Sequence, residues 1–436
     1  MQVAELGRKV AACQSHHLQH DLPGLMRSAR LPVLWDMSFR LQSLALSLLV
    51  GSQAMLGQGT PCPNSNGEPM TVVGNAPVVT LDLSRWDGTK RPARFVFDSG
   101  GGAIILDESL AEDLGLKPTG EPIEEAGARF VPASLPTAQF GPVLVSLSTS
   151  QAFLHPGKNS FDTRERIEGL LPGKALEPYQ VVLDYPRARF TIAPSGCVTH
   201  RGLKVPSPFL PASGHPRIDA SIDGKSYGLL LDTGSRVSLA RRSLLESLSA
   251  AHPTWPHSTG ASGTADMPGG NGEEFLLRVP EVTWGAFQIK NVLFVSRPDE
   301  TYSPSSFETP GEITGALGGN VLKSFRMEID YPHGTTYLEQ KARNAGDDMN
   351  SVGLVLDVDA ANNLIVRAIS STAAALTMSN VHPGDQIIEI DGKRETPWYL
   401  VDASNALSGA VGETKKLVIR RAGKEIQTIA RVAHIL

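Results

Sequence analysis

The chain has 436 residues, of which 40 are Lys or Arg and 45 are Asp or Glu, for a formal net charge of −5. With 41% hydrophobic and 19% charged residues, this composition excludes a disordered polyelectrolyte and gives no reason to expect a nucleic-acid partner. The length favours about three domains. The 42 glycines and 31 prolines favour a mainly β protein with short strands and many turns.

An apolar stretch near the N-terminus has the features of a secretory signal. Arg40 precedes an apolar run over residues 41–50, and Ser52 and Ala54 supply the small residues of a cleavage site. We therefore expect translation to start at Met37 and the protein to be extracytoplasmic, either periplasmic or secreted. The alternative is a buried helix behind a ragged tail. No apolar run reaches the roughly 18 residues that span a membrane, so we expect no stable membrane span.

The chain contains one internal duplication. Residues 94–106 and 228–240 each read as an apolar strand, an Asp-hydroxyl-Gly turn and a second apolar strand, followed by a short amphipathic helix. Farther along each copy a hydrophobic-Gly motif, at Gly169 and at Gly315, precedes an Asp-Tyr-Pro motif by 15 residues. Each copy is therefore predicted to form an all-β lobe of about 130 residues.

Asp98 and Asp232, the acids of the two duplicated turns, can act as a catalytic pair. Two carboxyls about 3 Å apart cannot both ionise, so such a pair shares one proton. One acid then serves as base toward a water while the other protonates a carbonyl oxygen. The alternative is that both acids only form turns in a duplicated β domain.

These motifs resemble those of bacterial retropepsin-like aspartyl proteases, of the pepsin/retropepsin clan, with two lobes in one chain. The resemblance covers about residues 72–339 and implies two acid-protease β-barrel lobes that form a pseudo-dimer, with Asp98 and Asp232 as the catalytic pair and no cofactor or metal. It implies active-site support from Ser99, Gly100, Gly169, Thr233, Gly234, Ser235 and Gly315.

The first lobe departs from the family pattern, because Gly101 replaces the usual Ser or Ala and Pro172 stands where the second copy has Gly318. The resemblance also implies a flap that closes on substrate between the Asp turn and the glycine motif of each lobe. The Gly-rich residues 258–272 are the better candidate, because such a composition makes a mobile lid.

The C-terminal part of the chain carries a second resemblance. Residues 381–392 contain Pro-Gly-Asp and Ile-Asp-Gly motifs that resemble the central segment of PDZ domains. An α+β domain of this kind accepts an extended peptide at a sheet edge and holds its C-terminal carboxylate in a tight loop. The expected loop, with Leu354 and Leu356 lining an apolar pocket, consists of Gly353, Leu354, Val355 and Leu356. The alternative is a packing module that binds nothing.

Of the three cysteines, Cys13 lies upstream of the expected start. In an oxidising compartment Cys62 and Cys197 can pair and tie the N-terminal tail to the end of the first lobe. The expected organisation is a mis-called or disordered extension (1–36), a signal peptide (37–54), a mature N-terminal tail (55–71), protease lobe 1 (72–198), protease lobe 2 (199–341), a linker (342–350) and a PDZ domain (351–436).

The sequence thus predicts an exported aspartic-type endopeptidase that acts on a peptide or protein substrate, with a C-terminal peptide as the ligand of the PDZ domain. The alternative function is a non-catalytic extracytoplasmic peptide-binding or scaffold protein with vestigial protease lobes. Serine and zinc hydrolases lack support, because the chain has neither a Gly-x-Ser-x-Gly nor a His-Glu-x-x-His motif.

Overall fold

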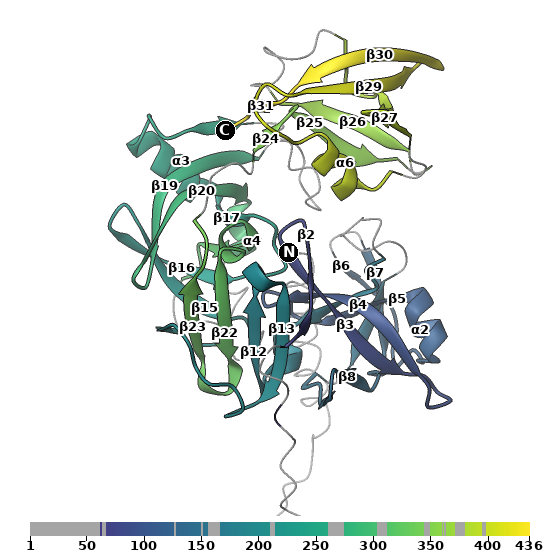
Figure 1. Ribbon diagram of the computed structural model, residues 1–436, viewed down its shortest axis with the longest axis vertical. Helices are drawn as coiled ribbons and strands as arrows, with labels where there is room; N and C mark the ends of the chain where they lie inside the picture. Colours follow the sequence, from purple (N-terminus) through teal and green to yellow (C-terminus); the bar gives the residue numbers. More distant parts are fainter. Residues whose placement is uncertain are drawn as a thin grey trace, which may run out of the picture.

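The structure is a computed structural model, and its described residues are 62, 67–125, 128–149, 151–155, 166–209, 214–259, 274–302, 312–343, 349–359, 361, 363–370, 380–394 and 398–436. The expected extension, signal peptide and cleavage site, and most of the expected flap, lie outside these residues. The fold is mainly β, as the sequence predicts (Figure 1). Within the described part of the chain, no helix combines the length and the apolar character needed to cross a membrane.

The first copy of the duplication folds into one sheet with the strand order β6-β7-β10-β5-β11-β4-β3-β8-β9, and β2 pairs with β3. A short helix, α2 (Glu108–Leu114), follows β5 and buries its apolar side on this sheet. The strands are β2 (Thr71–Val73), β3 (Ala76–Ser84), β4 (Lys90–Asp98), β5 (Ile104–Asp107), β6 (Ile123–Glu125), β7 (Ala128–Ala133), β8 (Ala138–Phe140), β9 (Val143–Val145), β10 (Ala152–His155) and β11 (Gly169–Pro172).

The second copy folds into a sheet with the order β15-β16-β21-β17-β20-β19-β18. Because β15 also pairs with β19, six of these strands close into a barrel. The helices α3 (Arg242–Ala251) and α4 (Gly319–Leu322) follow β17 and β21. The strands are β15 (Arg217–Ile222), β16 (Lys225–Leu231), β17 (Ser238–Arg241), β18 (His257–Thr259), β19 (Phe275–Trp284), β20 (Phe287–Arg297) and β21 (Gly315–Leu317).

A third sheet, with the order β1-β13-β12-β22-β23-β14, joins the two copies. Its central strands, β12 and β22, end in the two Asp-Tyr-Pro motifs and pair antiparallel in a symmetric register, with Gln180 opposite Asp330 and Asp184 opposite Arg326. This symmetry relates the two lobes by an approximate two-fold axis. The strands are β1 (Glu68–Pro69), β12 (Tyr179–Asp184), β13 (Arg189–Pro194), β14 (Leu203–Pro206), β22 (Phe325–Asp330) and β23 (Thr335–Gln340).

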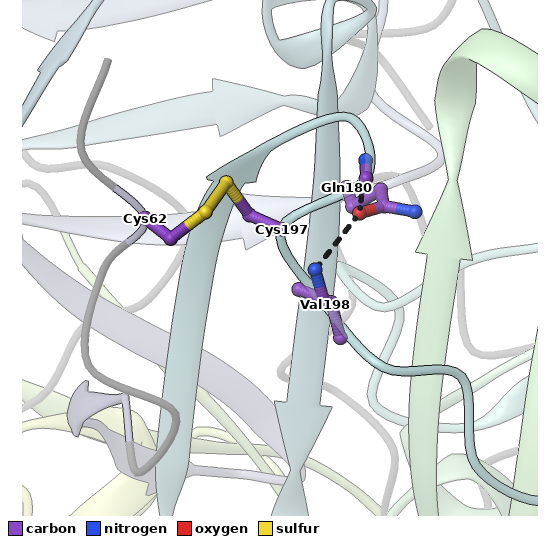
Figure 2. Close-up of a disulfide and its surroundings, with 5 residues drawn as sticks. Cys62, Gln180, Cys197 and Val198 are labelled. Atoms are coloured by element: carbon purple, nitrogen blue, oxygen red, sulfur yellow. Dashed lines mark hydrogen bonds between the residues drawn. A yellow bond between two sulfur atoms is a disulfide. The ribbon is translucent and has the colours of Figure 1, made fainter. Parts of the chain in front are cut away.

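A disulfide joins Cys62 to Cys197, with their Cα atoms 5.3 Å apart (Figure 2). The segment that contains Cys197 leads from the first lobe toward the second, and it is also held by Gln180 on β12. The Gln180 Oε1 atom accepts hydrogen bonds from the backbone N–H groups of Gly196 (3.1 Å) and Val198 (3.3 Å). The Cys62–Cys197 disulfide therefore ties the N-terminal tail to the junction between the lobes.

The C-terminal unit has a sheet of its own, ordered β25-β26-β27-β29-β30 with β28 on β27, and a separate hydrophobic core. Its helix, α6 (Leu400–Ala406), packs beside β25, which is an edge strand over the described residues. The strands of this unit are β24 (Asn350–Ser351), β25 (Leu354–Val358), β26 (Leu364–Ile369), β27 (Gln386–Ile390), β28 (Lys393–Arg394), β29 (Thr414–Arg421), β30 (Lys424–Arg431) and β31 (Ala433–His434).

The last residues of the chain pack against the second lobe, next to β19 and β20 (Figure 1). Met349, Ala433, Ile435 and Leu436 share one buried cluster with side chains of the sheet that carries Asp232. The guanidinium of Arg278, on β19, donates hydrogen bonds to the main-chain oxygens of Leu436 and Asn291, both at 3.0 Å. The C-terminal unit is therefore in contact with the second lobe through the end of the expected linker (342–350) and through its own last residues. The pairing of β24 with β31 brings both ends of the C-terminal unit onto this lobe.

Replacement of Ile435 by Ala is expected to lower the free energy of unfolding by about 3 kcal/mol, because it removes buried methyl groups from the contact between the units. The matched control is Ile429→Ala on β30, whose side chain is 61% exposed and whose loss changes stability by no more than about 0.5 kcal/mol. Denaturant unfolding of the full chain measures both. Equal losses in the two variants would contradict the packing described.

Candidate active site

The two Asp turns meet at the interface between the lobes. Asp98 is the last residue of β4, and Asp232 directly follows β16, the equivalent strand of the second lobe. The side chain of Asp98 is buried, that of Asp232 is half-buried, and the two carboxyls are hydrogen-bonded to each other. The structure thus brings together the two acids that the sequence analysis selected from positions 134 residues apart.

Backbone N–H groups hold each carboxylate in place. The N–H of Gly100 donates to Asp98 Oδ1, and the N–H of Ser235 donates to Asp232 Oδ1, both at 2.9 Å. Each turn glycine also lies against the acid of the other lobe. A Cβ atom added to Gly100 would be 2.6 Å from Asp232 Cγ, and one added to Gly234 would collide with the Asp98 carboxyl. Glycine is therefore required at both positions by the close approach of the turns.

The hydroxyl residues after the two acids interlock beneath them. The N–H of Ser99 donates to Thr233 Oγ1 (2.9 Å), and the N–H of Thr233 donates to Ser99 Oγ (3.0 Å). Each hydroxyl in turn donates to a main-chain oxygen of the opposite strand, Ser99 to Leu231 (2.6 Å) and Thr233 to Phe97 (2.8 Å). Both side chains are fully buried, so these reciprocal bonds act in a low-dielectric setting where they hold the geometry strongly.

The expected glycine strands pass behind the turns. β11 lies between β4, to which it is parallel, and β5, to which it is antiparallel, and β21 lies in the same way between β16 and β17. A Cβ atom on Gly169 would collide with the Phe95 ring, and one on Gly315 would collide with the Leu239 carbonyl. The two glycines therefore let a third strand pass close behind each Asp turn.

The first turn leaves less room at Gly101 than the second turn leaves at the equivalent Ser235. A Cβ atom on Gly101 would lie 2.9 Å from Asp98 Oδ2 and 3.0 Å from the Leu170 side chain. The equivalent Ser235 of the second turn instead has room, and its hydroxyl donates to the Val237 oxygen at 2.7 Å. The first turn is thus the more compressed of the two, which favours glycine there.

The electrostatics of the pair follow from burial. Desolvation is the largest cause that raises the pKa of both carboxyls, and the charge of Asp232 raises the pKa of Asp98 further. The N–H donors of Gly100 and Ser235 oppose this rise in part, because they stabilise the ionised forms. The pair therefore retains a proton at a pH where an isolated aspartate has lost it.

Two contacts near the site were not anticipated from the sequence. Asn75, in the tight turn between β2 and β3 of the first lobe, donates through Nδ2 to the main-chain oxygen of Arg236 (3.0 Å) and accepts from Lys323 Nζ (3.2 Å). This contact fixes the chain just beyond Asp232 from across the interface. The Gly74-Asn75 dipeptide is a typical hairpin signal, so the turn was detectable, although its partner in the other lobe was not.

The second unanticipated feature is the pair of Asp-Tyr-Pro tyrosines, Tyr185 and Tyr331, whose rings are buried near the acids. Their strand was expected, but nothing in the spacing indicated where these two side chains would lie. Among the described residues, no group of three or more His, Cys, Asp or Glu side chains is arranged to hold a metal ion.

The residues of the expected peptide-binding loop lie at the start of the C-terminal sheet. Gly353 has a left-handed φ of 73° and directly precedes the edge strand β25, so the tight loop is present. Leu354 and Leu356 are buried and pack in the hydrophobic core of the C-terminal unit.

In comparisons with known proteins, no protein-family model matches the chain, and no curated protein matches it in sequence.

Replacement of Thr233 by Val is expected to lower the free energy of unfolding by about 3 kcal/mol, because the buried N–H of Ser99 loses its acceptor and Phe97 loses its donor. Thr233→Ser, the matched control, keeps the hydroxyl and removes one methyl group, at a cost of about 1 kcal/mol. Unfolding in denaturant compares them, and similar losses would show that the interlock contributes little.

Proposed function

We propose that the chain is an aspartic-type endopeptidase, built from two retropepsin-like lobes, that hydrolyses peptide bonds with Asp98 and Asp232. The observation that carries this proposal is the hydrogen-bonded pair of carboxyls in two symmetric turns that are interlocked across the lobe interface. The duplicated arrangement of a glycine strand behind each turn supports the same assignment.

In the proposed reaction, ionised Asp232 removes a proton from a water as its oxygen attacks the peptide carbonyl carbon, and Asp98 gives its proton to the carbonyl oxygen. The resulting tetrahedral intermediate has two hydroxyls on one carbon. Its collapse breaks the C–N bond, with a proton transferred to the departing amine, and restores one proton to the pair. No covalent enzyme intermediate is needed, and the fixed N–H donors hold both carboxylates in position throughout.

The disulfide supports an extracytoplasmic location for the protein, because such bonds persist in oxidising compartments. The C-terminal unit is proposed to be a PDZ domain. Its edge strand β25, with α6 alongside and Gly353 in a left-handed turn at its start, supports the binding of an extended peptide as an added strand.

Asp98→Asn and Asp232→Asn are each expected to lower peptide cleavage by about 10³-fold or more, because each removes the shared proton chemistry. The measurement is pepstatin-sensitive peptide cleavage, scanned from about pH 3 to pH 8. The scan extends to neutral pH because burial raises the pKa of both carboxyls above the ordinary aspartate range.

The matched control is Asp107→Asn, since burial raises the pKa of this carboxyl to about 6 but it lies outside the pair. This variant is expected to keep its activity. Full activity in either dyad variant would refute the proposed mechanism.

Peptides with a free C-terminal carboxylate are expected to bind the full chain about tenfold more tightly than the same peptides with an amidated C-terminus, because backbone N–H groups near Gly353 would hold the charge. Calorimetric titration with a diverse peptide pool measures this. Equal affinity for both forms, or no binding in the pool, would favour a packing module.

A further inference from the structure

The tyrosines of the two Asp-Tyr-Pro motifs cross between the lobes. Tyr185 begins the short 3₁₀ turn η2 (Tyr185–Arg187) after β12, and Tyr331 begins η5 (Tyr331–His333) after β22. Because β12 and β22 pair antiparallel at the centre of the joining sheet, η2 packs on β22 and η5 packs on β12. Each tyrosine therefore reaches toward the other lobe, and the side chains are only 5% and 4% exposed.

The hydroxyl end of Tyr331 lies beneath the turn of the first lobe. A Cβ atom added to Gly173 would collide with Tyr331 Oη, and the same atom would be 3.2 Å from the Cα atom of Ser99. The Phe209 ring stacks on the Tyr331 ring with a centroid separation of 4.7 Å, which holds the tyrosine in this position. The hydroxyl is thus adjacent to the residue that follows Asp98.

The two hydroxyls have an unusual environment. Tyr185 Oη and Tyr331 Oη are both buried, and neither has a hydrogen-bond partner among the described residues. A buried, unsatisfied hydroxyl destabilises a fold relative to the same ring without it. By contrast Tyr179, at the start of β12, accepts a hydrogen bond from the Ser146 N–H at 2.7 Å. Phenylalanine at positions 185 and 331 would therefore pack without a loss of folding stability. The presence of the two hydroxyls is not explained by a contribution to stability.

The charge of one catalytic acid acts on each tyrosine. Burial is the largest cause that raises the pKa of both tyrosines, followed by the charge of Asp232 at Tyr185 and by the charges of Asp98 and then Glu177 at Tyr331. The phenols therefore stay neutral at every relevant pH and act as dipoles. The pairing is crossed, because each tyrosine feels the acid carried by the lobe it does not belong to.

We propose that Tyr185 and Tyr331 are positioning residues for the catalytic pair, in which the hydroxyl of each lobe's Asp-Tyr-Pro motif stabilises the ionised aspartate of the other lobe from below. Their role in catalysis rests on the proposed peptidase function, whereas their effect on the charge of the pair does not. The hydroxyls would thus be retained for the chemistry of the site at some expense of stability.

The test compares Tyr185→Phe and Tyr331→Phe with Tyr179→Phe as the matched control on the same joining sheet. In the first two variants the pH profile of peptide cleavage is expected to move to higher pH by about half a unit, because the ionised carboxylate loses a stabilising dipole. The maximal rate is expected to fall by about threefold to tenfold. Tyr179→Phe leaves the profile where it is in the wild type.

Thermal unfolding as a function of pH provides a second readout that needs no activity. The pKa of each buried acid is raised in the folded state, so the stability it contributes is fully present below about pH 4 and is lost as the pH rises through the folded-state value. Removing the hydroxyl of Tyr185 or Tyr331 is expected to raise the folded-state pKa of the acid pair further. Tyr185→Phe and Tyr331→Phe are therefore expected to melt above the wild type at pH 4, with a gain that shrinks toward pH 8. In an Asp98→Asn, Asp232→Asn background the gain becomes independent of pH.

Tyr179→Phe, which loses a satisfied hydrogen bond, is expected to melt below the wild type by the same amount at every pH. Should the curves of Tyr185→Phe and Tyr331→Phe run parallel to the wild type in both backgrounds, the tyrosines would be packing residues only and the proposal would be overturned. A wild-type chain that cleaves no peptide, yet shows the pH-dependent gain, would sink the proposed function and leave the crossed pair standing.

Discussion

The antiparallel pairing of β12 with β22 is the constraint on which the rest of the structure depends. These two strands, one from each copy of the duplication, meet in a symmetric register and are buried along their whole length. Their pairing sets the two-fold relation of the lobes, and that relation brings two separate Asp turns face to face. Without it neither acid would have a partner, and the interlock of Ser99 with Thr233 could not form.

The interface between the lobes combines rigidity with an electrostatic penalty. The interlocked hydroxyls and the N–H donors hold two carboxyls close together in a buried place, where a shared proton is the low-energy state. Gly100 and Gly234 remove the steric overlap between the turns, but the repulsion between the two carboxylates and the cost of burying them remain. Unfavourable electrostatic interactions that gather at one place are typical of a functional site.

The C-terminal unit is joined to the same framework through packing rather than through a tether alone. Its β24–β31 ribbon and the residues that follow lie on the outer face of the barrel whose strands β16 and β21 support Asp232. The buried Arg278 links the two units by hydrogen bonds to main-chain oxygens on both sides of the contact. A peptide bound at the edge of β25 would therefore sit on a body continuous with the second lobe.

The sequence by itself determined the duplication, the mainly β character and the identity of the residues around the turns. These are local properties, since a strand, a tight turn and a small residue at a fixed offset each leave a pattern in the chain. Asp98, Asp232 and the two strand glycines could be found in this way, and so could Cys62 and Cys197 as a candidate pair.

Only the tertiary structure decided which groups meet across the interface. Several contacts depend on the register of strands that are far apart in the chain. They are the crossing of Tyr185 and Tyr331, the contact of Asn75 with Arg236, the burial of Leu354 and Leu356, and the docking of Leu436 on Arg278. Non-local register leaves no periodic trace in either segment alone, so it emerges only when both are placed in one structure.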